Sequence, residues 1–280
     1  MGFDLETALD LAKMPALLGD KRVSPTVPSA NRKVIDLSFD HEDVRHYRID
    51  HQWFYESRSP VGGDNNPNWG FQTTKGPDGK KWMAMRSVNN SIRLTTLSHR
   101  FRPADYPKFD LDLMVTKGPK DADPVLGKSG KDDSAFQIWF TLRDLSRVKE
   151  RALGDKDDSR VFTFGYYWGE EVPGETRQEG QIFENTFSNK NVVVAKLPPA
   201  FQLVLNSGNK NLSKPVNYKR NLFEDIKKAY PQLNTQNLEV IAITLQMDSN
   251  DTSSQTEAFI KTLRLSSPEL QLERMAARGE

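Results

Sequence analysis

Residues 136–143 read FQIWFTLR, and this stretch decides the fold. Apolar residues occupy every second position, at Phe136, Ile138, Phe140 and Leu142. The positions between them carry Gln137, Trp139, Thr141 and Arg143. Side chains on a β-strand point alternately to the two faces of its sheet. The stretch therefore predicts a strand with one buried face and one face at least partly in contact with water.

The same period of two recurs along the chain. It is clearest at residues 109–115, 162–168 and 201–205, where each apolar series begins with phenylalanine. Further strands are predicted at residues 33–38, 81–87, 91–97, 191–196, 238–247 and 257–265. Many strands at this spacing indicate a mainly β protein, an antiparallel β-sandwich of the jelly-roll type.

Three helices are expected around this sandwich. A short N-terminal helix begins at Asp4 and leads into a linker rich in proline and serine. An internal helix begins at Asn221, with Glu224 placed as in a capping box. Ser267 followed by proline marks the start of a C-terminal helix. We therefore predict an N-terminal helix and linker at 1–32, a sandwich domain at 33–266 and a C-terminal helix at 267–280.

Composition excludes several classes of function. The chain has 39 basic and 38 acidic residues, so it lacks the positive excess that binding to nucleic acid uses. No apolar run of about 18 residues is present, so no membrane-spanning helix is predicted. Cysteine is absent, which excludes disulfides and thiolate catalysis. A cysteine-free chain fits an exported bacterial protein, and we expect a periplasmic or secreted location.

Aromatic and polar side chains suggest a binding site for carbohydrate. On the face of residues 136–143 that is not apolar, Trp139 offers a ring for stacking against a sugar, while Gln137 and Arg143 offer hydrogen bonds. Other aromatic residues lie where a strand meets a loop, or within a loop, at Tyr167, Trp168 and Trp69. The alternative is that these aromatic residues simply pack inside the sandwich.

Three long loops would adjoin such a site. They span residues 117–134, 144–160 and 169–180. Loops longer than about 12–15 residues are usually functional or mobile. The loop at 144–160 carries many charges of both signs, and it fits either a solvated hairpin tip or a lid over a ligand groove.

A turn rich in acidic and amide side chains follows the strand at 238–247. Asp248 and Asp251 carry the hard oxygen ligands that Ca²⁺ prefers. The spacing is not that of an EF-hand, and the same residues also suit a turn that hydrogen-bonds its own backbone. Calcium is thus a possible ligand, and no other cofactor is expected.

Catalytic motifs are weak. Glycoside hydrolysis needs two positioned carboxylates, and the several glutamates within residues 170–184 single out no pair. Jelly-roll polysaccharide lyases have a Gln-Ile-His strand, whereas here Gln137 and Ile138 are followed by Trp139. We therefore favour a binding protein over an enzyme, with a lyase or hydrolase as the alternative.

Between residues 82 and 265 the order of short motifs resembles a family of exported bacterial proteins of unknown function. The motifs include Asp132-Asp133 before a strand, Tyr167-Trp168-Gly169, and the turn after Met247. The resemblance implies a jelly roll similar to galactose-binding modules, and it implies no activity.

These observations together predict an exported β-sandwich protein that binds a carbohydrate or a cell-envelope protein. The ligand would lie on one sheet face and its long loops. A structural subunit of an envelope assembly is a further alternative, and the oligomeric state stays open.

Overall fold

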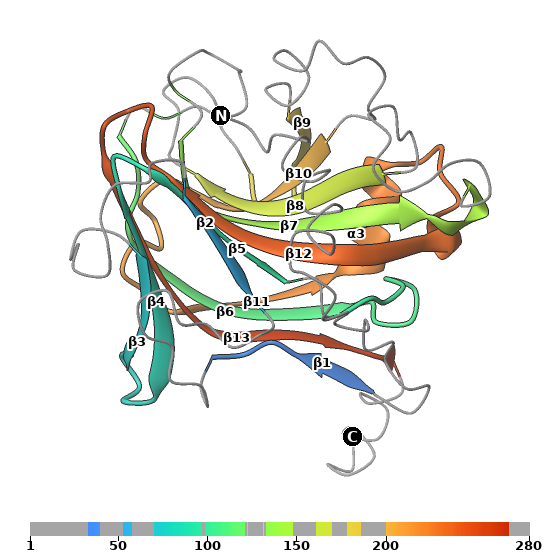
Figure 1. Cartoon of the computed structure of the whole chain (residues 1–280), viewed down its shortest axis with the longest axis horizontal. Coiled ribbons are helices and arrows are strands. Elements are labelled where there is room, and N and C mark those ends of the chain that lie inside the picture. Colours follow the sequence, from blue (N-terminus) through green and yellow to red (C-terminus); the bar gives the residue numbers. More distant parts are fainter. Residues whose placement is uncertain are drawn as a thin grey trace, which may run out of the picture.

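The predicted strands form two sheets that pack face to face (Figure 1). The computed structural model describes residues 33–39, 53–57, 70–96, 99–120, 122, 131, 133–147, 161–169, 178–185 and 200–268. The first sheet has six strands: β11 (Val216–Asn221), β6 (Lys108–Lys117), β13 (Gln255–Ser266), β4 (Lys81–Val88) and β3 (Gly70–Lys75) in that order, with β1 (Val34–Asp36) beside β13. The mainly β sandwich expected from the sequence is confirmed.

The second sheet has seven strands and carries the stretch at 136–143. Its order is β2 (Phe54–Ser57), β5 (Ser91–Thr96), β12 (Leu238–Asp248), β7 (Ser134–Asp144), β8 (Val161–Gly169), β10 (Ala200–Ser207) and β9 (Ile182–Asn185). Its neighbouring strands are antiparallel except β8 and β10, which run parallel. Figure 1 shows β7, β8 and β12 bowed, with the side away from the six-stranded sheet on the inside of the curve.

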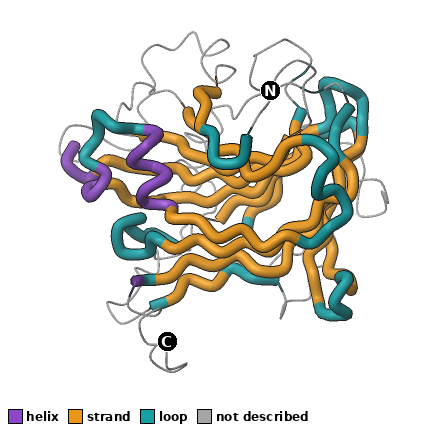
Figure 2. Tube along the Cα trace, turned by 180° about the vertical axis from the view of Figure 1, so that it is seen from behind, coloured by secondary structure: helices purple, strands orange, loops and turns teal. Residues whose placement is uncertain are grey.

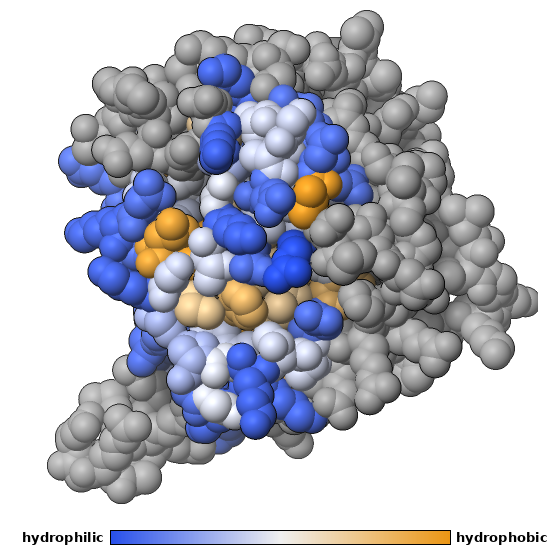
Figure 3. All heavy atoms as spheres, turned by 90° about the vertical axis from the view of Figure 1, so that its left-hand side faces the viewer, coloured by the Kyte–Doolittle hydropathy of each residue, from blue (hydrophilic) through white to orange (hydrophobic). Residues whose placement is uncertain are grey.

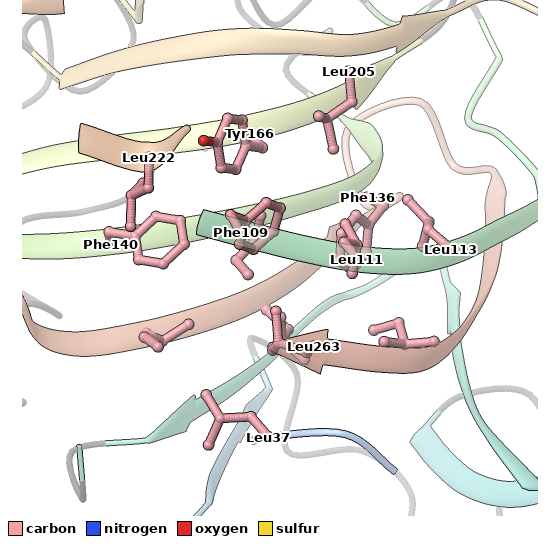
Figure 4. Close-up of a cluster of buried hydrophobic side chains, with 14 of the residues drawn as sticks. Leu37, Phe109, Leu111, Leu113, Phe136, Phe140, Tyr166, Leu205, Leu222 and Leu263 are labelled. Carbon is pink, nitrogen blue, oxygen red and sulfur yellow. The ribbon is translucent and has the colours of Figure 1, made fainter. Parts of the chain in front are cut away.

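The core between the sheets comes from the period-two positions. On β6, Phe109 and the apolar residues that alternate with it are buried. They face the apolar side of β7 and β8 (Figure 4). There the ring of Tyr166 stacks on the ring of Phe109, with 4.8 Å between the ring centres, and the ring of Phe140 meets the Phe109 ring edge-on, at 5.9 Å. Stacked and edge-on rings are the favoured aromatic contacts.

One helix, α3 (Leu222–Ala229), closes one end of the sandwich (Figure 2). As predicted, Asn221 caps it, and its side chain accepts a hydrogen bond from the Glu224 backbone N–H at 3.1 Å. The apolar face of α3 is buried, and its Asp225 is also buried. Arg220 pairs with both oxygens of Asp225. Short 3₁₀ turns lie at Leu145–Arg147 and Thr235–Asn237.

Several predictions fall on other parts of the chain. The N-terminal helix, the strand at 191–196 and residues 269–280 of the C-terminal helix lie outside the described residues. The division into three segments therefore stays a prediction. The sequence did not reveal β2, β3, β9 or β11, because these strands are short and carry few apolar residues at alternate positions.

Candidate functional site

The side of the seven-stranded sheet that points away from the core is unusually polar. Cross-strand partners share a sheet face, and Trp139 is paired with Thr244 on one side and with Gly165 on the other. We call this surface the outer face. It includes Thr95, Gln137, Trp139, Thr141, Thr163, Tyr167, Gln202, Thr244, Gln246 and Asp248.

The outer face is buried, contrary to the expectation that it would be partly wet. Trp139, Tyr167 and Gln202 have no exposed surface, and Gln137 is only 4% exposed. The expectation was wrong because alternation identifies the apolar face of a strand and is silent on what lies over the opposite face. β7 and β8 are therefore covered on both sides along most of their length.

Trp139 is held in a defined orientation on this face. Its indole N–H donates a 2.7 Å hydrogen bond to the Gln137 side-chain oxygen. A methyl group added to Gly165 would lie 2.7 Å from Cε3 of the indole, so the ring extends over β8 at this glycine. Gln137 therefore orients Trp139, and Gly165 on the neighbouring strand leaves room for the indole ring.

Tyr167 lies on the same face as Trp139, on the neighbouring strand β8. It is paired with Gln137 across β7 and β8. A methyl group on Gly169 would lie only 1.5 Å from the Tyr167 hydroxyl oxygen, and Phe183 meets the Tyr167 ring edge-on at 5.7 Å. The outer face thus holds two oriented aromatic rings.

Buried polar atoms without partners mark the outer face. Within the part of the chain that the structure describes, the side-chain oxygens there without a hydrogen-bond partner include Thr141 Oγ1, Thr163 Oγ1, Gln246 Oε1 and Asp248 Oδ1. Each such atom costs about 1–3 kcal/mol of stability. Not every hydroxyl on the face is in this state, since those of Thr95 and Thr244 lie 2.9 Å apart.

Asp248 ends the polar row at the edge of the outer face. Burial raises the pKa of its carboxyl to about 7; nearby Asp133 adds to the rise, and Arg93 opposes it. The Gln246 side-chain amide lies 3.4 Å from Asp248 Oδ2. At neutral pH this carboxyl is therefore divided between its neutral and ionised forms.

Asp133 organises the turn that was predicted to hold calcium. Its carboxylate accepts hydrogen bonds from the backbone N–H groups of Asp251 and Thr252, at 3.0 and 2.7 Å. Across the described ranges, no group of three His, Asp or Glu side chains is placed to hold a metal ion. Calcium at Asp248 and Asp251 therefore stays a prediction.

Of the other predicted site residues, Trp168 does not join Trp139, whereas Arg143 lies on the same face of β7, four positions along the strand. Trp168 lies on the opposite side of β8, within the core, where its ring meets Tyr218 edge-on at 6.3 Å. Arg143 forms an ion pair with Glu239 at the far end of β7. Trp69 lies outside the described residues.

Sequence reasoning missed the partners contributed by β12 and β10. Thr244 and Gln246 alternate with apolar residues in the segment ITLQMD at 243–248, which is the same signal that identified Gln137 and Trp139. Reading that alternation together with β7 would have found the polar side of β12. Gln202 is similarly placed on β10, opposite Gly165.

Comparisons with known proteins show similar architecture. No protein family model matches the chain, and no curated protein matches it. The solved structures that resemble it include a family 12 xyloglucanase from Bacillus licheniformis, at 8% identity, with a TM-score of 0.44, covering 84% of this chain and 99% of that one. A family 11 carbohydrate-binding module from Clostridium thermocellum matches at 5% identity and a TM-score of 0.34, covering 81% of this chain and 94% of the module.

A carbohydrate-binding module specific for non-crystalline cellulose also matches, at 8% identity and a TM-score of 0.32, covering 82% of this chain and 97% of the module. These are β-sandwich proteins that act on or bind polysaccharides. At such identities and TM-scores the similarity describes the architecture alone. The resemblance to an exported family of unknown function is not matched by a family model.

None of the helices within the described ranges has the length and apolar character needed to cross a bilayer.

Proposed function

We propose that this protein binds a polysaccharide through the outer face of its seven-stranded sheet. The observation that carries the proposal is the row of buried polar side chains with unpartnered oxygens beside Trp139. Sugars present hydroxyl groups that both donate and accept hydrogen bonds, and their C–H faces stack on aromatic rings. The outer face offers both kinds of contact.

Permanent packing under another part of the chain explains the outer face less well. Surfaces that stay buried are usually apolar, or have their polar groups fully hydrogen-bonded. Here Thr141, Thr163 and Gln246 each keep a buried oxygen without a partner within the described structure. A ligand that hydrogen-bonds these atoms recovers the free energy that their burial costs.

Ligand access requires opening of the surface over this face. Trp139 and Tyr167 have no exposed surface, so a sugar reaches their rings only in a state of the protein that exposes them. The opening makes binding slower than docking onto a preformed open groove, and the free energy of opening lowers the apparent affinity. Quenching of tryptophan fluorescence by acrylamide, with and without polysaccharide, measures this opening.

A matched pair of tryptophan variants tests the proposal. Trp139→Phe removes an indole that donates to Gln137, while Trp82→Phe removes a buried indole on the other sheet that donates to Asp78 at 2.8 Å. Affinity gels and calorimetry with the neutral polysaccharides xyloglucan, mixed-linkage β-glucan and galactan measure binding. We expect Trp139→Phe to weaken binding at least tenfold and Trp82→Phe to leave it within twofold.

Two results would overturn the proposal. One is a folded wild-type protein that binds none of these polysaccharides. The other is equal affinity in wild type and Trp139→Phe, with circular dichroism confirming that both are folded.

Export belongs to the same proposal. The absence of cysteine supports a periplasmic or secreted location, where polysaccharides of the cell envelope or the surroundings are accessible. Fractionation of the expressing bacterium, followed by immunoblotting, tests it. Protein found only in the cytoplasmic fraction contradicts it.

Hydrolysis is a second candidate function, and Asp248 favours it. A carboxyl with a pKa near 7 is suited to act as a general acid at neutral pH. Release of new reducing ends from the same three polysaccharides, compared between wild type and Asp248→Asn, measures the activity. Binding without any release of reducing ends would leave the protein a binding module.

A further inference from the structure

A separate cavity opens at the end of the sandwich opposite α3. Its volume is about 700 Å³, within the range of small-molecule sites. Five segments line it: the end of β6 and the residues that follow, the start of β7, the end of β8, the loop after β10 and the turn between β12 and β13. This is the left-hand end in Figure 1, where the described surface is mainly hydrophilic with small hydrophobic patches (Figure 3).

The cavity is positively charged. Lys117 and Lys120 are the charged side chains among its lining residues, and both are exposed. Lys117 Nζ lies 3.5 Å from the Gln255 side-chain oxygen, and in the described residues neither lysine forms an ion pair with a carboxylate. Two ammonium groups that form no ion pair within the described ranges favour a negatively charged ligand.

The carboxylates of the surrounding strands are already engaged. Asp133 is fully buried and accepts hydrogen bonds from the turn at 251–252. Glu257 is paired with Arg86 and accepts a 2.6 Å hydrogen bond from Thr116. Both acidic groups are therefore hydrogen-bonded within the protein, and the charge of Lys117 only adds to the lowering of the pKa of Glu257 by Thr116 and Arg86.

The rest of the lining suits a sugar. Apolar walls come from Val115, Leu212 and the almost fully buried Trp168. Hydroxyl and amide groups come from Asn209, Gln255 and the serines and threonine of residues 252–254. A mixture of apolar walls and a few polar groups is typical of sites for small organic ligands.

We propose that this cavity is a second binding site, specific for a saccharide that bears a carboxylate, with Lys117 and Lys120 binding the carboxylate group. The site is distinct from the outer face, because Trp168 and Trp139 project to opposite sides of the seven-stranded sheet. An acidic polysaccharide or a uronate released from one has this chemistry.

Calorimetry with digalacturonate and with its dimethyl ester tests the charge requirement. The ester keeps the sugar skeleton and loses both carboxylate charges, so we expect it to bind at least tenfold more weakly than digalacturonate. The variant Lys117→Ala, Lys120→Ala should lose at least tenfold in affinity for digalacturonate. The matched control Lys227→Ala, Lys228→Ala removes two exposed lysines from α3 at the other end of the sandwich, and should stay within twofold of wild type.

A pocket-filling variant locates the site without changing charge. A Cβ added at Gly118 would meet only the Ala135 side chain, at 3.9 Å, so Gly118→Met is expected to fold normally and to occupy the cavity. Digalacturonate binding should then be lost while the melting temperature is kept.

Three outcomes would overturn the proposal: no binding of digalacturonate at millimolar concentration, equal binding of acid and ester, or equal affinity in wild type and Gly118→Met. Trp139→Phe should bind digalacturonate as wild type does. The second site and the outer face are thereby tested independently.

Discussion

Replacing Asp248 by asparagine should stabilise the protein at neutral pH and leave it almost unchanged in acid. Burial raises the pKa of this carboxyl from 3.8 to about 7 in the folded state. Well below its ordinary pKa of 3.8, the group is protonated in both folded and unfolded chains and has no effect. As the pH rises from about 4 to about 7, the unfolded chain ionises first, so the wild-type protein loses stability over this window.

The size of the effect follows from the shift. Each pKa unit is worth about 1.4 kcal/mol, so a shift of about three units sets an upper limit of about 4 kcal/mol at pH 8. Asparagine keeps an oxygen that can accept from Gln246, whose amide lies 3.4 Å from Asp248 Oδ2, and it carries no charge. The hydrogen bonds and ion pairs of Asp36 and Glu257 lower the pKa of those carboxyls, so their own contributions change at lower pH.

Equilibrium unfolding in urea at pH 4, 5, 6, 7 and 8 measures the effect. We expect the free energy of unfolding of Asp248→Asn, relative to wild type, to rise between pH 4 and pH 8 by at least about 1 kcal/mol. Asp105→Asn, which changes an exposed carboxylate, is the control and should shift stability by less than about 0.5 kcal/mol at every pH. A variant that gains no stability between pH 4 and pH 8 would refute the reasoning.

Three further changes probe the outer face and the helix. Thr141→Val together with Thr163→Val removes two unpartnered buried hydroxyls, so it should leave the melting temperature equal or higher while weakening polysaccharide binding in calorimetry; a lower melting temperature contradicts this. Gly165→Ala places a methyl group 2.8 Å from the Ile138 carbonyl oxygen and should destabilise by about 1–3 kcal/mol in urea unfolding, whereas the open position Gly118→Ala should not. Asp225→Ala leaves the partly exposed Arg220 and the buried Tyr166 hydroxyl without the carboxylate that they share, and should cost about 1–3 kcal/mol by the same assay; unchanged stability contradicts this.

The sequence predicted the strands of the core because one property, alternation, determines both burial and pairing there. Phe109 and Phe136 begin apolar series that reach the same core from the two sheets. The cap of α3 was equally local, since Asn221 and Glu224 lie within one turn of each other. Edge strands such as β11 carry too few apolar residues for the same signal to identify them.

The candidate site was only partly predictable. Gln137, Trp139 and Tyr167 were identified together, because two adjacent strands show the alternation. Trp168 follows Tyr167 in sequence and therefore points to the other side of its strand, so the two could not line one surface. The burial of Trp139 depends on what lies over the sheet, and no local pattern in residues 136–143 reports that.

The position of β13 has a consequence for how the chain folds. This strand is the last of the described strands in sequence, yet it lies in the interior of its sheet, between β6 and β4. Ile260 is paired with Leu113 and with Met83, contacts that span well over a hundred residues of chain. Loop closure over such distances is slow, and the six-stranded sheet cannot close until residues 255–266 have left the ribosome. The growing chain therefore remains without this central strand through most of its synthesis.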